Sequence, residues 1–162
     1  MRAPRWDALV RPLLVLVVVL CACRPEPQPL DLPRPSGVGT PGLGFFHEGG
    51  ATIRLGPERF ELGLSGAPST YAAGMLSLSY GELGSGRSLN ITGPAREGEN
   101  RTGPNLSLSI GTDERTYEAR DGGCVILVER AGPRGVDGSF RCRRLAGDGV
   151  RARASGTFRA SA

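Results

Sequence analysis

Residues 150–160 read VRARASGTFRA, and small or apolar side chains alternate with polar ones along this stretch. The first set is Val150, Ala152, Ala154, Gly156, Phe158 and Ala160, and the second is Arg151, Arg153, Ser155, Thr157 and Arg159. A period of two places each set on its own face of a β-strand. The stretch therefore predicts a strand with one face in a core and the other in water.

The same alternation recurs upstream, back to residue 51. Short runs are each ended by Gly, Pro, Asn or Asp, and they cover residues 53–55, 60–64, 76–80, 89–91, 106–110 and 116–119. Residues 124–129 are apolar at both parities, which predicts the most deeply buried strand. No helical period separates these runs, so we expect an all-β fold of about eight or nine short strands. A single small antiparallel β-sandwich and a flattened barrel both fit this pattern.

The N-terminus has the features of an export signal. Arg2, Arg5 and Arg11 precede an apolar run from Leu13 to Leu20, and small residues then lead to a cysteine. This order is typical of a signal peptide. The apolar run is too short to stay as a membrane span, because a helix needs about 20 apolar residues to cross the hydrocarbon core.

The residues that end the leader, Leu20-Cys21-Ala22-Cys23, resemble the lipobox of bacterial lipoproteins. The resemblance implies that residues 1–22 are removed and that Cys23 is diacylated and becomes the new N-terminus. Two or three acyl chains make release from a bilayer negligible. Since Arg24 rather than Asp follows the cysteine, the resemblance also implies the outer membrane of a Gram-negative envelope.

A linker is predicted between this anchor and the β-domain. Residues 24–41 contain six prolines, few apolar residues and no periodicity, a composition that cannot build a core. Residues 42–50 are rich in glycine but include Phe45 and Phe46, which we expect to dock on an edge of the domain. The predicted organisation is a signal peptide at 1–22, a tether at 23–50 and a single domain at 51–162.

Two cysteines remain once the leader is removed and Cys23 is acylated: Cys124 and Cys142. An even remainder in an oxidising compartment indicates a disulfide, with two buried thiols as the alternative. The turn chemistry of residues 131–135 predicts a hairpin that brings the two cysteines opposite or nearly opposite each other.

Catalytic and metal sites find little support in the sequence. The single histidine, His47, lies in the glycine-rich entry segment, so a histidine-based triad or a zinc site is not expected. Two carboxylate pairs, Glu97 with Glu99 and Asp113 with Glu114, fall in polar loops without the aromatic residues that bind sugars. We expect no enzyme activity and no cofactor, and a small hydrolase is the least favoured function.

Charge is distributed unevenly along the chain. Residues 23–114 carry 7 arginines against 10 acids, whereas residues 115–162 carry 10 arginines against 5 acids. If the last two strands pair, one outer face should carry a cationic stripe of Arg141, Arg143, Arg151, Arg153 and Arg159. Guanidinium groups suit phosphate and carboxylate, although a merely solvated face is the alternative.

These features together predict a membrane-anchored envelope lipoprotein with a non-enzymatic binding or structural role. Its expected partners are the membrane, through the lipid, and an anionic envelope polymer, through the stripe; nucleic acid is not expected in that compartment. A second hypothesis is an accessory subunit that binds an envelope protein through an apolar edge strand.

Overall fold

The computed structural model describes residues 42–94, 96–119 and 121–162. The predicted signal peptide, Cys23 and the tether up to residue 41 lie outside these ranges. Within them the chain is all-β, as predicted, and forms twelve strands. The strands are β1 (Leu43–Phe46), β2 (Glu48–Leu55), β3 (Glu58–Leu64), β4 (Ser69–Ala72), β5 (Met75–Gly81), β6 (Ser88–Pro94), β7 (Gly98–Arg101), β8 (Ser107–Gly111), β9 (Thr116–Ala119), β10 (Cys124–Gly132), β11 (Gly135–Gly147) and β12 (Val150–Ser161).

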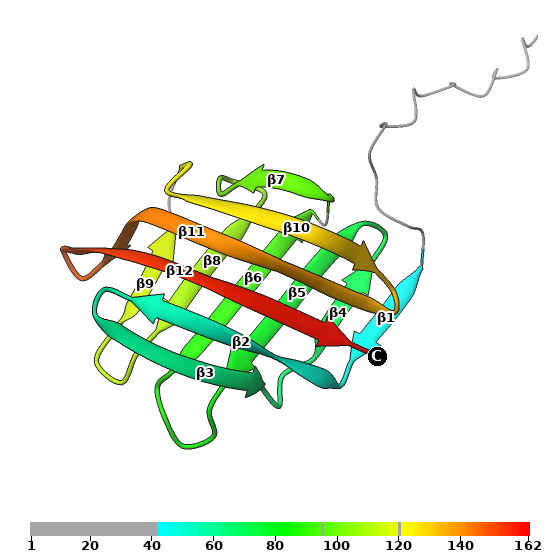
Figure 1. Cartoon of the computed structure of the whole chain (residues 1–162), viewed down its shortest axis with the longest axis horizontal. Coiled ribbons are helices and arrows are strands. Elements are labelled where there is room, and N and C mark those ends of the chain that lie inside the picture. Colours follow the sequence, from blue (N-terminus) through cyan, green and yellow to red (C-terminus); the bar gives the residue numbers. More distant parts are fainter. Residues whose placement is uncertain (1–41, 95, 120) are drawn as a thin grey trace, which may run out of the picture. The chain divides into compact units, whose positions relative to one another are not determined.

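Eight of these strands close into an antiparallel ring. Its order is β5-β3-β2-β12-β11-β9-β8-β6, and β6 pairs again with β5. Four further strands extend the two layers: β4 and β1 continue from β5, and β10 and β7 continue from β11. In Figure 1 the layer that carries β10, β11, β12, β2 and β3 crosses in front of the layer that carries β4, β5, β6, β8 and β9.

The ring is flattened because the two layers join through very few residue pairs. At one corner only Gly63↔Gly81 and Leu64↔Tyr80 join β3 to β5. At the other, Leu145↔Ala119 and Ala146↔Glu118 join β11 to β9. The ring is therefore a flattened barrel, one of the two architectures that the sequence allowed. It has more strands than the eight or nine expected, because β1, β4 and β7 have no clear alternation of apolar and polar residues.

The core lies between the layers and follows the predicted alternation. Leu76, Leu78 and Tyr80 of β5 are at most 3% exposed, and Leu108 and Ile110 of β8 are similarly buried. The intervening serines of β5 face outward and are half-buried. The longer strands thus each turn one apolar face toward a single core.

The described domain begins before Ala51, inside the stretch predicted as tether. β1 pairs with β4, and β2 starts at Glu48. Phe46 is 5% exposed and belongs to the core, whereas Phe45 is 51% exposed. The sequence analysis missed these strands because it interpreted their glycines as a sign of a linker. Gly44 has a structural reason to be glycine, since a Cβ there would stand only 2.7 Å from the Pro133 Cα.

The expectation for β10 was wrong in one respect. Ile126 and Val128 point into the core, but Val125 is half-buried and Leu127 is 38% exposed. The strand is therefore buried on one face only, and its second apolar face lines an outer surface. On the inner face Cys124 lies directly opposite Cys142, and the two form the predicted disulfide.

Candidate functional site

The outer face of the front layer carries an ordered row of arginines. Strand register places Arg101 of β7 next to Val125, and Val125 next to Arg141 of β11. The row continues through Ser155 of β12 to Arg54 of β2. It ends at Arg59 of β3, which is opposite Arg54. We call Arg101, Arg141, Arg54 and Arg59 the arginine row; all four side chains are exposed.

A β-bulge adds three more arginines beside this row. Cys142 pairs with Ala154 and Leu145 pairs with Ala152, so Arg143 and Arg144 together oppose the single residue Arg153. The backbone N–H groups of Arg143 and Arg144 both donate to the carbonyl of Gly123, at 2.9 and 3.4 Å. Bulges bend a strand and re-aim its side chains; here the bulge leaves two successive arginines exposed.

The arginines surround a hollow. A depression of about 830 Å³ is lined by Arg101, Arg141, Arg143 and Arg144, with Val125, Leu127, Ser139, Ser155 and Thr157 among its other walls. A second hollow of about 330 Å³ is lined by Arg54 and Arg59 and shares Ser155, Gly156 and Thr157 with the first. The two hollows therefore adjoin at β12, and we call them together the basic depression.

A row of hydroxyl groups runs beside the arginine row, two residues further along each strand. Ser139 of β11 pairs with Thr157 of β12, which pairs with Thr52 of β2. This hydroxyl row ends in a carboxylate on each side, because the same register leads through Leu127 to Glu99 and from Thr52 to Glu61. Glu99 is the single acid among the described residues that line the larger hollow.

The guanidinium groups of the larger hollow have no ionic partner in the described part of the chain. Within the described ranges, no carboxylate lies within 4.0 Å of Arg101, Arg141, Arg143 or Arg144. At the far end Arg59 meets Glu61 at 3.7 Å, but both side chains are more than 70% exposed, so water screens this pair. The positive charge of these arginines is therefore available to an external anion.

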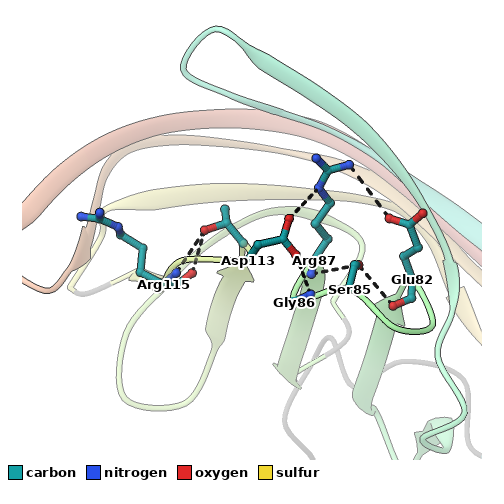
Figure 2. Close-up of polar contacts among 7 residues, drawn as sticks. Glu82, Ser85, Gly86, Arg87, Asp113 and Arg115 are labelled. Atoms are coloured by element: carbon teal, nitrogen blue, oxygen red, sulfur yellow. Dashed lines mark hydrogen bonds and ion pairs between the residues drawn. The ribbon is translucent and has the colours of Figure 1, made fainter.

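Arg87 shows the opposite situation, and Figure 2 shows its surroundings. Its guanidinium lies 3.7 Å from Asp113 and 4.0 Å from Glu82, and it also stands 5.6 Å from the centre of the Phe60 ring. Asp113 in addition accepts a hydrogen bond from the Gly86 N–H at 2.8 Å. These contacts join the β5–β6 turn to the β8–β9 turn, so Arg87 has a structural role that the arginines of the basic depression lack.

The charge of the outer face reverses along the strands. A third hollow, of about 450 Å³, lies beyond the hydroxyl row and is lined by Glu61, Glu129, Asp137 and Arg159. Arg130 Nη2 lies 2.7 Å from Asp137 Oδ1, a contact between charges rather than an aligned hydrogen bond. This end of the face is acidic and its cations are partly neutralised.

The structure separates the five arginines of the predicted stripe. Arg141 and Arg143 line the basic depression, and Arg153 lies opposite the bulge beside it. Arg151 lies two residues from Arg153 along β12, opposite Ala146 and toward the β11–β12 turn. Arg159 lies opposite Asp137 in the acidic hollow.

Four arginines of the site escaped the sequence argument: Arg54, Arg59, Arg101 and Arg144. Three of them come from strands β2, β3 and β7, whose positions beside β12 and β10 depend on long-range pairing. Arg144 lies at the parity predicted for the inner face, and only the bulge turns it outward.

The carboxylates weighed as hydrolase candidates have separate contacts in the described part of the chain, and none of the three hollows described above holds both members of a pair. Glu97 accepts a hydrogen bond from the Ala131 N–H at 3.3 Å, and Asp113 contacts Arg87. Glu114 pairs with Arg115 while 78% exposed. No group of three or more His, Cys, Asp or Glu side chains in the described ranges could hold a metal ion.

Burial perturbs two tyrosines, neither of them part of the basic depression. Burial raises the pKa of Tyr80 well above its usual range, and the pKa of Tyr71 is raised by burial and by the charge of Glu97. Among the described residues, no helix is long and apolar enough to cross a bilayer. Comparison with known proteins gave no match: no family model, no curated protein and no solved structure is similar to this chain.

Proposed function

We propose that the chain is an exported lipoprotein of the bacterial envelope, anchored through Cys23, whose β-domain is a non-enzymatic module that binds an anionic envelope component. The observation that carries the binding role is the basic depression, a concave face lined by arginines and hydroxyl groups. In its larger hollow, no guanidinium has a carboxylate partner among the described residues. Arginine forks recognise both phosphate and carboxylate through paired hydrogen bonds.

The shape and composition of the face support binding over simple solvation. An exposed arginine that serves only solubility does not need its neighbours on adjacent strands to be arginines as well. Here Arg101 and Arg141 stand on either side of Val125, and Arg143 and Arg144 follow at the bulge. Such convergence concentrates positive potential over a hollow and raises the local concentration of anions.

Retention on anionic matrices tests the binding role. The wild-type domain is compared with a variant in which Arg101, Arg141, Arg143 and Arg144 are all replaced by Gln. In the matched control, Gln instead replaces four arginines outside the basic depression, so that the same charge is removed: Arg96, Arg115, Arg134 and Arg159. Immobilised polyphosphate and polygalacturonate serve as probes at low salt, beside a neutral dextran matrix.

We expect the site variant to lose at least about tenfold in affinity, about 1.4 kcal/mol, and the control to lose much less. Equal losses in the two variants would show that only net charge matters. Wild-type protein that passes through both anionic matrices would refute the binding role.

The anchor has its own test. Cells that express the full chain are fed an alkyne-labelled fatty acid, and the protein is examined by gel and by intact mass. We expect label on the wild-type chain and none on Cys23→Ser. A mature chain that starts elsewhere and carries no acyl mass would overturn the envelope assignment.

A second candidate function has one specific observation in its favour. Leu43 and Phe45 of the edge strand β1 are 62% and 51% exposed, and Met75, which the register places in the same row as Leu43 through Ala72, is 47% exposed. An apolar edge of this kind suits a protein partner. Under this reading, Phe45→Asp releases a partner that co-purifies with the lipidated wild-type chain, while Leu83→Asp, at a fully exposed loop position, retains it.

A further inference from the structure

The basic depression has a direction, and this direction narrows the class of its ligand. Along β11 the outward residues run from Arg143 through Arg141 and Ser139 to Asp137. At about 3.4 Å per residue, a ligand lying along this strand would move from cationic to acidic surface within roughly 20 Å. A linear polyanion is repelled by the far half of that path.

Across the strands the charge does not reverse. The arginine row crosses β7, β10, β11, β12, β2 and β3, and none of its six register positions holds an acid. With about 4.8 Å between neighbouring strands, the row is roughly 24 Å long. A chain of anionic groups therefore stays in contact with arginine only when it lies perpendicular to the strands.

The second row adds a requirement for hydroxyl groups. Ser139, Thr157 and Thr52 lie side by side and run parallel to the arginine row, about 7 Å away along the strands. Each hydroxyl both donates and accepts, while Glu99 and Glu61 at the row's ends accept only. A ligand that fits both rows carries an acid on one edge and hydrogen-bonding hydroxyls on the other, in every repeat.

From these two rows we infer that the ligand is an acidic polysaccharide, lying across the strands with its carboxylates on the arginine row and its hydroxyls on the hydroxyl row. This inference rests on the proposed anion-binding function and specifies its ligand. Polyphosphate and acidic peptides satisfy the first row but offer no hydroxyls to the second. A lipid headgroup can contact one position of the arginine row and is too short to span it.

Length dependence tests the path. Binding of the described domain to galacturonate oligomers, from the dimer to the octamer, is measured by calorimetry. We expect affinity to rise with length until the oligomer spans the row. The double variant Arg54→Gln/Arg59→Gln, at the far end, should weaken the octamer about tenfold and leave the dimer unchanged, because short oligomers bind at the larger hollow alone. Equal affinities for dimer and octamer, or no effect of the double variant, would overturn the path and leave anion binding intact.

Chemical selectivity tests the ligand class. Poly-glutamate of matched charge serves as a polyanion without hydroxyls, and Ser139→Ala with Thr157→Val removes the centre of the hydroxyl row. We expect the wild type to bind the oligosaccharide about tenfold more tightly than poly-glutamate. The variant should lose this preference because its affinity for the oligosaccharide falls, while its affinity for poly-glutamate stays the same. Equal binding of both polymers by the wild type would overturn the saccharide class, whereas failure to bind any polyanion would refute the proposed function itself.

Discussion

The ring of Phe140 occupies the space above Gly156, its direct partner on the neighbouring strand. A Cβ on Gly156 would stand 2.7 Å from two atoms of that ring, closer than side-chain carbons approach in proteins. The relation is reciprocal, since Phe158 lies against Gly138 across the same pair of strands. Two aromatic rings thus fill the inner face of β11 and β12, directly beneath the basic depression.

Gly156→Ala is expected to destabilise the domain by about 1–3 kcal/mol, because the added methyl group overpacks the core and must displace both the Phe140 ring and the Thr52 backbone. Urea unfolding followed by circular dichroism measures the change. Gly63→Ala is the matched control, since a Cβ there meets nothing within 4 Å. Equal effects of the two substitutions would show that the ring does not need the glycine.

The disulfide is expected to contribute about 3 kcal/mol to the free energy of unfolding. The two cysteines are 18 residues apart, and closing a loop of this length restricts the unfolded chain by about that amount in the chain-entropy model. Reduced wild-type protein and the double variant Cys124→Ala/Cys142→Ala should unfold at similarly lowered urea concentrations. An unchanged midpoint after reduction would contradict this contribution.

Ala73→Asn is expected to stabilise the domain by about 1 kcal/mol. Ala73 and Gly74 form the two-residue turn between Ala72 and Met75, and Ala73 has a φ of 49°. Alanine is strained in this left-handed region, whereas Asn-Gly is a preferred pair for such hairpins. Thermal unfolding measures the gain, with Ala67→Asn in an exposed bend as the control. A loss of stability at position 73 would contradict the turn assignment.

Tyr80→Phe is expected to leave stability unchanged or to raise it by up to about 1 kcal/mol at neutral pH. The Tyr80 hydroxyl is fully buried and has no hydrogen-bond partner in the described part of the chain, so its removal abolishes a desolvation cost. Urea midpoints at neutral pH test this effect.

The same variant should also change the response to alkali. Burial raises the pKa of Tyr80 in the folded state, while tyrosine in the unfolded chain ionises near pH 10. Above about pH 10 the unfolded chain therefore releases a proton that the folded protein keeps, and stability falls as pH rises. Phe at position 80 removes this contribution, so the variant should lose less stability than the wild type between about pH 9 and pH 11. Parallel pH profiles would contradict it.

The sequence revealed the features that depend on local alternation. The strand at residues 150–160, the β10–β11 hairpin and the pairing of Cys124 with Cys142 all follow from side-chain parity and turn chemistry over short separations. The eight-strand closure and the extra short strands do not. A four-residue strand such as β7 shows no period, and its place beside β10 is set by contacts more than 20 residues away.

The sequence predicted only part of the candidate site, because only some of its arginines lie on strands that are paired over short separations. Arg141 and Arg143 lie on strands whose pairing the sequence indicates, so their common face could be expected. Arg54 and Arg101 join them only through β2 and β7, and Arg144 joins them through the bulge. Arg159 lies on the same face as the predicted stripe, because parity fixes the face on which a residue lies. Parity does not show which charges surround that residue, and Arg159 lies in the acidic hollow.

The position of β12 has a consequence for how the protein assembles. Its partners are β11, the strand just before it, and β2, near the start of the domain, so that Ala154 meets Leu55. The ring cannot close until strands roughly 100 residues apart have met, a topology that slows folding. During that interval β2 has an unsatisfied hydrogen-bonding edge toward β12, and a newly synthesised chain would need protection from aggregation until β12 is in place.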